Sequence, residues 1–173
     1  MNATTPVANL SPAKRKRIAL TAATKPGVLD ELANDQHWHT RFAVANNPTT
    51  PEETLTRLAA DQTYMVRRGT AENNHTSAST LTALSADPNT IVRFAVAKNP
   101  NTPPDTLTRL ANDPAPAVRQ QAEHTRKHIL DEHINTLTGT AREHAQLLAP
   151  TFTGWPDDLD ELLGTLTEET GTP

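Results

Sequence analysis

The chain repeats itself with a period of 26 residues, and this period limits what it can fold into. Three consecutive blocks align without gaps, namely residues 40–65, 66–91 and 92–117. Residues 16–39 align with them if two residues are deleted near Thr24, and a further partial copy begins at Val118. A fixed period of roughly 20 to 50 residues indicates a repeat architecture, in which each unit packs only against its neighbours.

Each block predicts two short helices. An apolar segment such as residues 42–45 is followed by Asn-Pro. Proline lacks an N–H and restricts the residue before it, so the first helix is expected to end there. Thr50 is expected to be the N-cap of the second helix and Pro51 its first residue. Leu55 and Leu58 then begin an apolar stripe. Neither helix buries its stripe alone, so the blocks are expected to stack into a solenoid.

The composition fits many small contacts better than a core of large rings. The 173 residues include only 3 Phe, 2 Trp and 1 Tyr, but 14 Pro. The absence of cysteine excludes disulfides, thiol nucleophiles, cysteine-ligated zinc and iron–sulfur clusters. No apolar run approaches the roughly 18 residues of a membrane span, and no apolar stretch precedes the first basic cluster. We therefore expect no membrane partner, no signal peptide and a cytoplasmic location.

The repeated pattern V-R-x-A-V-A-x-N-P-x-T-P-x-x-x-L-x-x-L-A-x-D resembles the leucine-rich repeat variant family. The resemblance covers residues 16–119 and is best in residues 92–117. It implies an all-α fold, a right-handed solenoid of short helix pairs in which α-helices and 3-10 helices alternate, similar in outline to HEAT repeats. The family is also associated with a cysteine-ligated iron–sulfur module. This chain has no cysteine to hold one, so no cofactor is expected.

The third block departs from the pattern. Gly69 and Thr70 replace Ala-Val, and Asn74 and Ser77 replace the two prolines. We expect this block to be looser than the others or bent.

The chain divides by composition into three parts. Residues 1–13 are expected to form a flexible tail, residues 14–119 the repeats, and residues 120–173 a C-terminal helical cap. The repeats contain 13 Lys and Arg against 10 Asp and Glu, whereas the last part contains 3 against 10. Its helices are expected at residues 118–137, at residues 141–149 and after Pro156. The last helix has an acidic start and a leucine stripe, composed of Leu159, Leu162, Leu163 and Leu166.

The C-terminal part has two interpretations. A solenoid needs its ends sealed, which favours a cap with Phe152 and Trp155 as wedges. Alternatively, the acidic amphipathic helix docks on a partner.

Charged residues recur once per block and predict a ladder along the stack. Each block opens with an arginine at its second position, beginning with Arg17. An aspartate lies six residues before each later arginine. The resulting pairs are Asp35 and Arg41, Asp61 and Arg67, Asp87 and Arg93, and Asp113 and Arg119. As in HEAT repeats, which this arrangement resembles, such pairs tie neighbouring repeats together, because arginine and carboxylate bond bidentately. The alternative is a stripe of arginines that binds phosphate.

Positions that differ between blocks are the candidates for partner recognition. Phe42, Arg68 and Phe94 follow the ladder arginine, and Asn46, Glu72 and Lys98 lie four residues further on, on the same helix face. They predict a partly exposed patch of apolar and cationic side chains, typical of protein-binding hot spots. The alternative is that the Phe rings pack on adjacent repeats. Arg57 and Arg109, between the two leucines, are further variable positions.

These patterns favour a non-catalytic scaffold that binds another protein, with a monomer as the expected state. The alternative is a HEAT-like nucleic-acid binder that uses residues 14–17 with Arg57, Arg68 and Arg109 on one face. An enzyme is not expected, because no nucleophile elbow, phosphate loop or dinucleotide fingerprint occurs. His124, His128 and Glu132 share helical spacing but lack a metal signature, so no metal site is expected.

Overall fold

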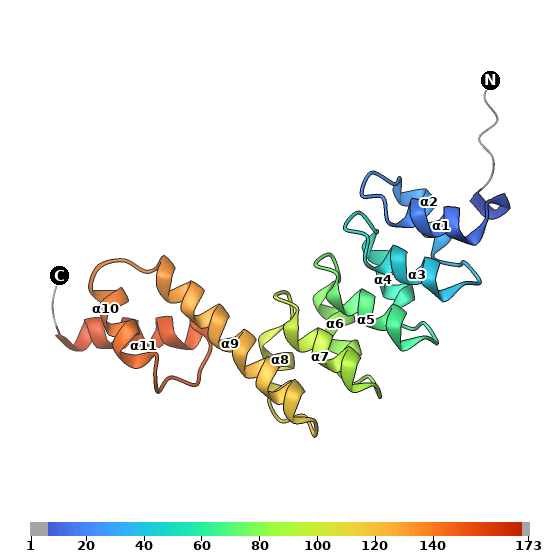
Figure 1. Ribbon diagram of the computed structural model, residues 1–173. Coiled ribbons are helices and arrows are strands. Elements are labelled where there is room, and N and C mark those ends of the chain that lie inside the picture. The colour runs from blue at the N-terminus through green and yellow to red at the C-terminus, as the bar shows by residue number, and fades with distance from the viewer. Residues whose placement is uncertain (1–6, 171–173) are drawn as a thin grey trace.

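A computed structural model describes the backbone of residues 7–170 and the side chains of residues 7–165. All regular structure in that part of the chain is helical (Figure 1). The elements are η1 (Val7–Asn9), α1 (Pro12–Ala19), α2 (Pro26–Leu32), α3 (Trp38–Ala45), α4 (Glu52–Leu58), α5 (Tyr64–Glu72), α6 (Ala78–Leu84), α7 (Thr90–Lys98), α8 (Pro104–Leu110), α9 (Pro116–Thr136), α10 (Gly139–Leu148) and α11 (Pro156–Thr170).

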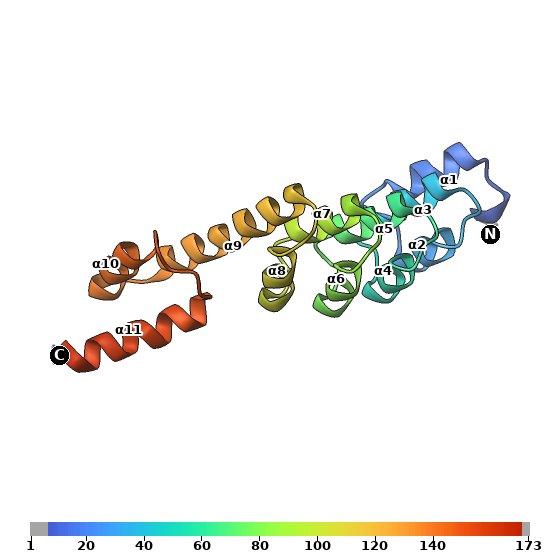
Figure 2. The same cartoon turned by 90° about the horizontal axis from the view of Figure 1, so that it is seen from below.

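The helices form two layers of an elongated solenoid, which confirms the expected fold class. The first helices of the pairs, α1, α3, α5 and α7, pack successively against one another and then against α9. The second helices, α2, α4, α6 and α8, form the other layer (Figure 2). Figure 1 shows the N-terminal repeats at one end of the molecule and α10 with α11 at the other.

The expected alternation of α-helices and 3-10 helices is wrong, because both members of each pair are α-helical. In the second helix α4, the amide of Leu55 bonds to the carbonyl of Pro51 at 3.0 Å, and that of Ala59 to Leu55 at 2.9 Å. These four-residue bonds define an α-helix. Of the described elements, η1 alone is a 3-10 helix.

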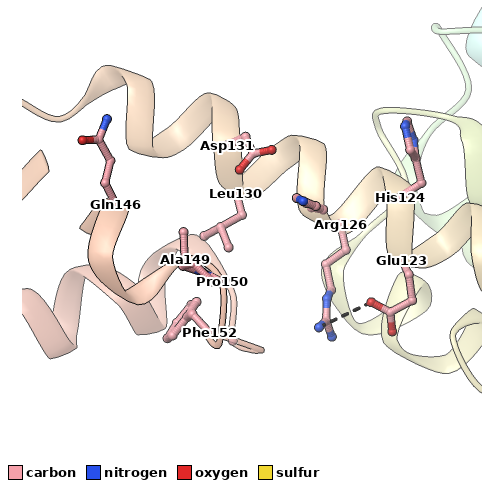
Figure 3. Close-up of a pocket in the computed structure, with 11 residues that line it drawn as sticks. Glu123, His124, Arg126, Leu130, Asp131, Gln146, Ala149, Pro150 and Phe152 are labelled. Atoms are coloured by element: carbon pink, nitrogen blue, oxygen red, sulfur yellow. Dashed lines mark ion pairs between the residues drawn. The ribbon is translucent and has the colours of Figure 1, made fainter. Parts of the chain in front are cut away.

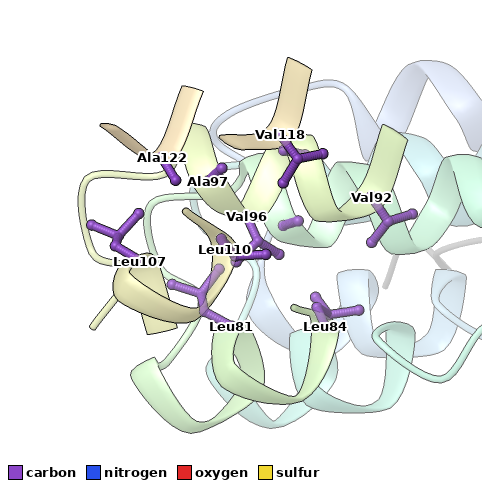
Figure 4. Close-up of a cluster of buried hydrophobic side chains, with 11 residues drawn as sticks. Leu81, Leu84, Val92, Val96, Ala97, Leu107, Leu110, Val118 and Ala122 are labelled. Carbon is purple, nitrogen blue, oxygen red and sulfur yellow. The ribbon is translucent and has the colours of Figure 1, made fainter. Parts of the chain in front are cut away.

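The core consists of aliphatic side chains from both layers, as the few aromatics suggest. Leu81, Leu84 and Leu107 of the second helices meet Val92 and Val96 of α7 (Figure 4). A matching cluster further towards the N-terminus is built around residues such as Leu29, Leu32 and Val44. Each fully buried leucine or valine contributes about 2 kcal/mol, so stability comes from many similar contacts.

A buried asparagine ends the first helix of each pair and also joins it to the preceding repeat. The Asn73 amide Nδ2 donates to the carbonyls of Ala45 at 2.7 Å and Asn47 at 2.9 Å, while its Oδ1 accepts from the amide of His75. Asn47 and Asn99 make the equivalent bonds. These side chains satisfy backbone groups that a helix end would otherwise leave unpaired in the core.

Thr50 is not the N-cap of α4, which corrects the expectation. Its hydroxyl donates to the carbonyl of Val44 at 2.6 Å, and the cap position belongs to Pro51. Thr24, Thr76 and Thr102 make the same bond to the residue six positions earlier. The threonine therefore closes the turn between the two helices of a pair.

The first block needs no deletion. Arg15, not Arg17, lies 26 residues before Arg41 and makes the equivalent contacts, while Arg17 is exposed. The flexible tail predicted for residues 1–13 stays a prediction for residues 1–6, which lie outside the described residues. After them, Val7 packs against the N-terminal core and η1 leads directly into α1.

Helix α9 is long because its sequence lacks the punctuation of the repeats. Position 125, which follows Asn99 by one period, is a threonine, and no proline follows it. The first half of α9 covers the last repeat through Val118 and Ala122. The second half contributes Leu130 and Ile134 to a separate cluster with α10 and α11.

The C-terminal helices lie close to the expected ranges. Leu159 and Leu163 of α11 are buried, whereas Leu162 is 37% exposed. The side chain of Leu166 lies outside the described residues. Trp155 packs on the core of the last repeats, and its indole N–H donates to the Thr108 hydroxyl at 3.3 Å. The role of residues 120–173 as a cap stays a prediction, to which this contact lends support.

Candidate interaction surface

The ladder arginines bond forward along the chain, to the aspartate 20 residues later. Arg41 contacts Asp61 at 2.5 and 3.0 Å, Arg67 contacts Asp87 at 2.6 and 3.0 Å, and Arg93 contacts Asp113 at 2.7 and 3.0 Å. Arg15 and Asp35 form the first pair. The pairing predicted at six residues is wrong for the side chains. At that spacing the arginine instead bonds to the aspartate's backbone carbonyl, as Arg41 does to Asp35 at 2.7 Å.

Each ladder carboxylate also shapes the turn into the next helix. Asp61 accepts from the amide of Thr63 at 2.8 Å, and Asp113 from that of Ala115 at 2.8 Å. Burial raises the pKa of Asp61, but the bonds from Arg41 and Thr63 outweigh it, and the pKa is lowered overall. The guanidinium of Arg93 lowers the pKa of Asp113. The carboxylates therefore stay charged and paired at neutral pH.

The ladder arginines are consequently engaged in the structure, not directed at a ligand. The carboxylate partners raise the pKa of Arg41, Arg67 and Arg93. Arg119 has no carboxylate in its forward position, and its guanidinium bonds to the carbonyls of Asp113 and Pro114. A guanidinium with its donors committed in this way attracts phosphate weakly.

The exposed side of the first helices forms one continuous surface, which we call the first-helix face. Its residues recur at i, i+3 and i+7 in each helix, which places them on one side. They are Ala13, Lys16 and Leu20 at α1, His39, Phe42 and Asn46 at α3, Met65, Arg68 and Glu72 at α5, and Ile91, Phe94 and Lys98 at α7. None of these residues is buried. Lys16, not Ile18, occupies the position that precedes Phe42 in the row.

The large apolar side chains that the repeats expose gather on this face or at its edge. Leu20 is 59% exposed, Ile91 47% and Tyr64, at the start of α5, 38%. Phe42 and Phe94 are half-buried against the core. Trp38, at the start of α3, stacks on His39 with ring centroids 3.7 Å apart and meets Phe42 edge-on at 6.4 Å. Every aromatic residue of the repeats thus lies on or beside the first-helix face.

Gly69 determines how Phe42 lies on the face. A Cβ at this position would come within 2.6 Å of Asn46 Nδ2 and 3.1 Å of the Phe42 ring. The equivalent residues in the flanking repeats are Ala43 and Ala95. The absent methyl group therefore lets the ring and the amide settle against α5, and both alternatives for Phe42 hold in part: it packs on the adjacent repeat and keeps an exposed edge.

The sequence comparison fits this geometry. The family described as Leucine rich repeat variant matches residues 38–62 and 92–115. These segments contain α3 with α4 and α7 with α8, two of the stacked pairs. The repeats are leucine rich repeat variant repeats. No curated protein and no solved structure matches the chain significantly.

The five predicted contact residues do not form one patch within these leucine rich repeat variant repeats. Phe42, Arg68 and Phe94 lie in one row of the first-helix face, whereas Arg57 and Arg109 lie on the second helices. Arg57 bonds to Asp30 of the preceding repeat at 2.5 Å, and Arg109 donates to the carbonyl of Thr82 at 3.2 Å. The single basic stripe predicted for nucleic acid therefore does not form from Arg57, Arg68 and Arg109.

The second helices join one another through polar side chains. The hydroxyls of Thr56 and Thr80 lie 3.1 Å apart, and those of Thr82 and Thr106 2.9 Å apart. In the last repeat, the indole of Trp155 replaces the missing threonine partner of Thr108. Sequence reasoning missed both this threonine row and the asparagine row, although their recurrence every 26 residues was the available signal.

A cleft of about 590 Å³ lies beyond the repeats, between α9 and the end of α10. Figure 3 shows Leu130, Ala149 and Phe152 on its apolar side, while Arg126 and Glu123 pair at 3.5 Å on the other. Oppositely charged groups balance along its walls, so the cleft favours no ligand charge.

The histidines do not converge on a metal site. His128 meets Glu132 at 3.5 Å on the exposed side of α9. Among the described residues, no three potential metal ligands of the His, Cys, Asp and Glu type lie together. The described helices also include none that is long and apolar enough to cross a membrane.

Proposed function

We propose that the chain is a non-catalytic scaffold that binds another protein through the first-helix face. The repeats themselves form a helical scaffold of a family that generally mediates protein interactions. The observation that carries the proposal is the segregation of exposed apolar side chains. Leu20, Tyr64 and Ile91 lie at this surface, together with the half-buried rings of Phe42 and Phe94.

The second-helix layer provides the contrast. Its outward positions carry short or polar side chains, for example Glu52, Glu53, Thr56 and Ser79. Interface centres are enriched in aromatic residues, methionine and arginine, and the first-helix face contains all three kinds. Exposed apolar side chains that gather on one surface indicate an interaction site, whereas scattered ones need no explanation.

The experiment compares two matched double variants in affinity capture from the native host with quantitative mass spectrometry. Phe42→Ala with Phe94→Ala removes the two rings, and Thr56→Ala with Glu53→Ala alters the second layer. We expect the first to deplete the specifically captured proteins by about tenfold or more, and the second to retain them. Circular dichroism verifies that both variants are folded. Equal capture by both would contradict the proposal.

A nucleic-acid partner has less support, because Arg57 and Arg68 are paired with Asp30 and Glu72. The remaining basic group is Lys14, Lys16 and Arg17 on α1, all exposed. A gel shift with duplex DNA at low salt tests it, since phosphate contacts dominate such binding. A shift that Lys14→Glu with Lys16→Glu abolishes would establish the alternative.

A further inference from the structure

We propose that the first-helix face binds an extended, acidic segment in the polyproline II conformation, with an apolar residue, then a carboxylate, then an apolar residue at every third position. This inference rests on the proposed function and names the partner that the face fits. In the bound state the carboxylate contacts Arg68, and the two apolar side chains contact Phe42 and Phe94.

The spacing of the row carries the first step. Phe42, Arg68 and Phe94 occupy the same position in α3, α5 and α7. Packed helices lie about 8–10 Å apart. A polyproline II helix has three residues per turn and a rise of about 3.1 Å, so side chains on one side recur about every 9 Å. One residue of such a segment therefore meets each repeat.

The depth of the surface carries the second step. The hollow on this side, between the ends of α5 and α7, measures about 380 Å³ and is lined by residues including Glu72, Ala95 and Lys98. A partner α-helix is about 10–12 Å across and needs a long apolar groove. Two half-buried rings separated by an arginine do not form such a groove, but they match single side chains of a thin, extended segment.

Hydrogen-bond donors at the edge carry the third step. The indole N–H of Trp38 and the hydroxyl of Tyr64 have no hydrogen-bond partner among the described residues. A polyproline II segment makes no internal hydrogen bonds, so its carbonyls are free to accept from such donors. Aromatic side chains that present a donor are the features by which proline-rich segments are recognised.

Charge carries the last step. Lys16, Arg68 and Lys98 lie on the face, against the single carboxylate of Glu72. Arg68 bonds to Glu72 at 2.9 Å, and both side chains are about one third exposed, at 36% and 31%. An exposed pair of this kind is weak, so a partner carboxylate can replace Glu72. The face therefore favours an acidic segment over a basic one.

The test uses the full chain and labelled synthetic peptides in fluorescence anisotropy. The probe is Pro-Leu-Pro-Pro-Glu-Pro-Pro-Leu-Pro, whose prolines preset the conformation. One control peptide has Lys in place of Glu, and a second has one residue added between Glu and the second Leu. A third peptide is helical and carries the same Leu, Glu and Leu at seven-residue spacing.

We expect the probe to bind at least about tenfold more tightly than each control, a preference of about 1.4 kcal/mol. Arg68→Glu should reverse the preference for Glu over Lys. Glu72→Gln should tighten probe binding by about two- to fivefold, because Arg68 loses its competing partner. Arg57→Glu, on the second layer, should leave the affinity unchanged.

Three outcomes overturn this inference: equal affinity for the probe and its Lys or respaced control, tighter binding of the helical peptide, or no binding of any peptide at millimolar concentration. Such a result leaves the proposed function standing if Phe42→Ala with Phe94→Ala still abolishes protein capture. If capture also persists in that variant, both proposals fail.

Discussion

At the scale of single residues, two polar side chains per repeat define how successive units connect. A ladder arginine reaches forward to the next repeat's aspartate, and a buried asparagine reaches back to the preceding repeat's carbonyls. Both are satisfied by several bonds in a small space, so removing one member leaves buried groups without partners.

Asp61→Asn tests the ladder. The change leaves the Arg41 guanidinium without its counter-charge, and we expect a loss of about 3 kcal/mol in the free energy of unfolding, measured in urea at pH 7. Asp30→Asn, at the exposed pair with Arg57, is the control and should lose less than about 1 kcal/mol. Similar losses for both variants would show that burial does not strengthen the ladder pair.

Acid should weaken the same pairs. The folded-state pKa values of Asp35, Asp61 and Asp113 are lowered, so their stabilisation is complete above the unfolded value of about 3.9. It is lost as the pH falls through the lower folded values. We expect the wild-type free energy of unfolding to decrease below pH 4, and less steeply in Asp61→Asn. Parallel pH profiles would contradict this role.

Asn73→Ala tests the asparagine row. It removes two donors and one acceptor that serve buried backbone groups, so we expect a loss of about 2–3 kcal/mol. The neighbouring Asn74→Ala changes an exposed side chain and should stay within about 0.5 kcal/mol of wild type. Thermal denaturation of the two variants gives the comparison, and equal melting temperatures would refute the structural role of Asn73.

At the scale of elements, the repeat at residues 66–91 keeps the common backbone although it lacks both prolines. The N-cap Ser77 has φ −65° and ψ 154°, close to φ −59° and ψ 146° at Pro51. Residue 74, like Pro48 and Pro100, follows a buried asparagine. The contacts of Asn73 and Thr76 therefore hold the turn without the conformational restriction of proline. The looser or bent backbone expected from the sequence is absent from this turn.

Asn74→Pro with Ser77→Pro should stabilise the chain. Both positions already have a conformation that proline accepts, so the change mainly reduces the entropy of the unfolded chain, by about 0.4–1 kcal/mol for each substitution. We expect a melting temperature a few degrees higher. Ser85→Pro is the opposite control, because it removes the bond from the Ser85 amide to Leu81 at 2.9 Å. A lower melting temperature in the double variant would mean that the turn is strained.

The helices and the solenoid followed from the sequence because their signals are local and periodic. Leu55 and Leu58 marked the buried stripe, and the 26-residue spacing marked the stack. The direction of the ladder did not follow, because Arg41 is nearer in sequence to Asp35 than to Asp61, and only packing decides which carboxylate it meets. The role of Thr50 was misassigned because threonine favours an N-cap, yet here its hydroxyl found a buried carbonyl.

The candidate surface was predictable in part. Phe42, Arg68 and Phe94 were placed in one row by the period alone, and they share the first-helix face. Arg57 and Arg109 were grouped with them by charge, a property that carries no information on which layer a residue occupies. The contribution of Gly69 to the position of Phe42 depends on a contact between helices, which no local pattern indicates.

At the scale of the whole molecule, α9 belongs to two clusters. Its first half completes the core of the last repeat, and its second half forms the C-terminal cluster. Trp155 is the link from the α10–α11 loop back to the repeats, through Thr108. Repeat proteins couple mainly to nearest neighbours, so damage at this end should stay near it.

Trp155→Ala should therefore loosen one end of the solenoid. We expect a loss of about 1–2 kcal/mol, less than for a fully buried ring, with faster amide exchange in α8 and α9 and unchanged exchange in α3. Phe152→Ala, in the C-terminal cluster, should leave α8 protected. Hydrogen exchange with mass spectrometry distinguishes the two. Faster exchange throughout the chain would show global rather than nearest-neighbour coupling.

The forward direction of the ladder has a consequence for how the molecule can change in length. Every arginine uses the aspartate 20 residues ahead, and every asparagine uses carbonyls 26 and 28 residues behind. Duplication of residues 66–91 would therefore supply one complete new set of partners and leave no existing bond open. The gene can gain or lose whole units by recombination without compensating mutations, and the length of the binding surface would change by one repeat each time.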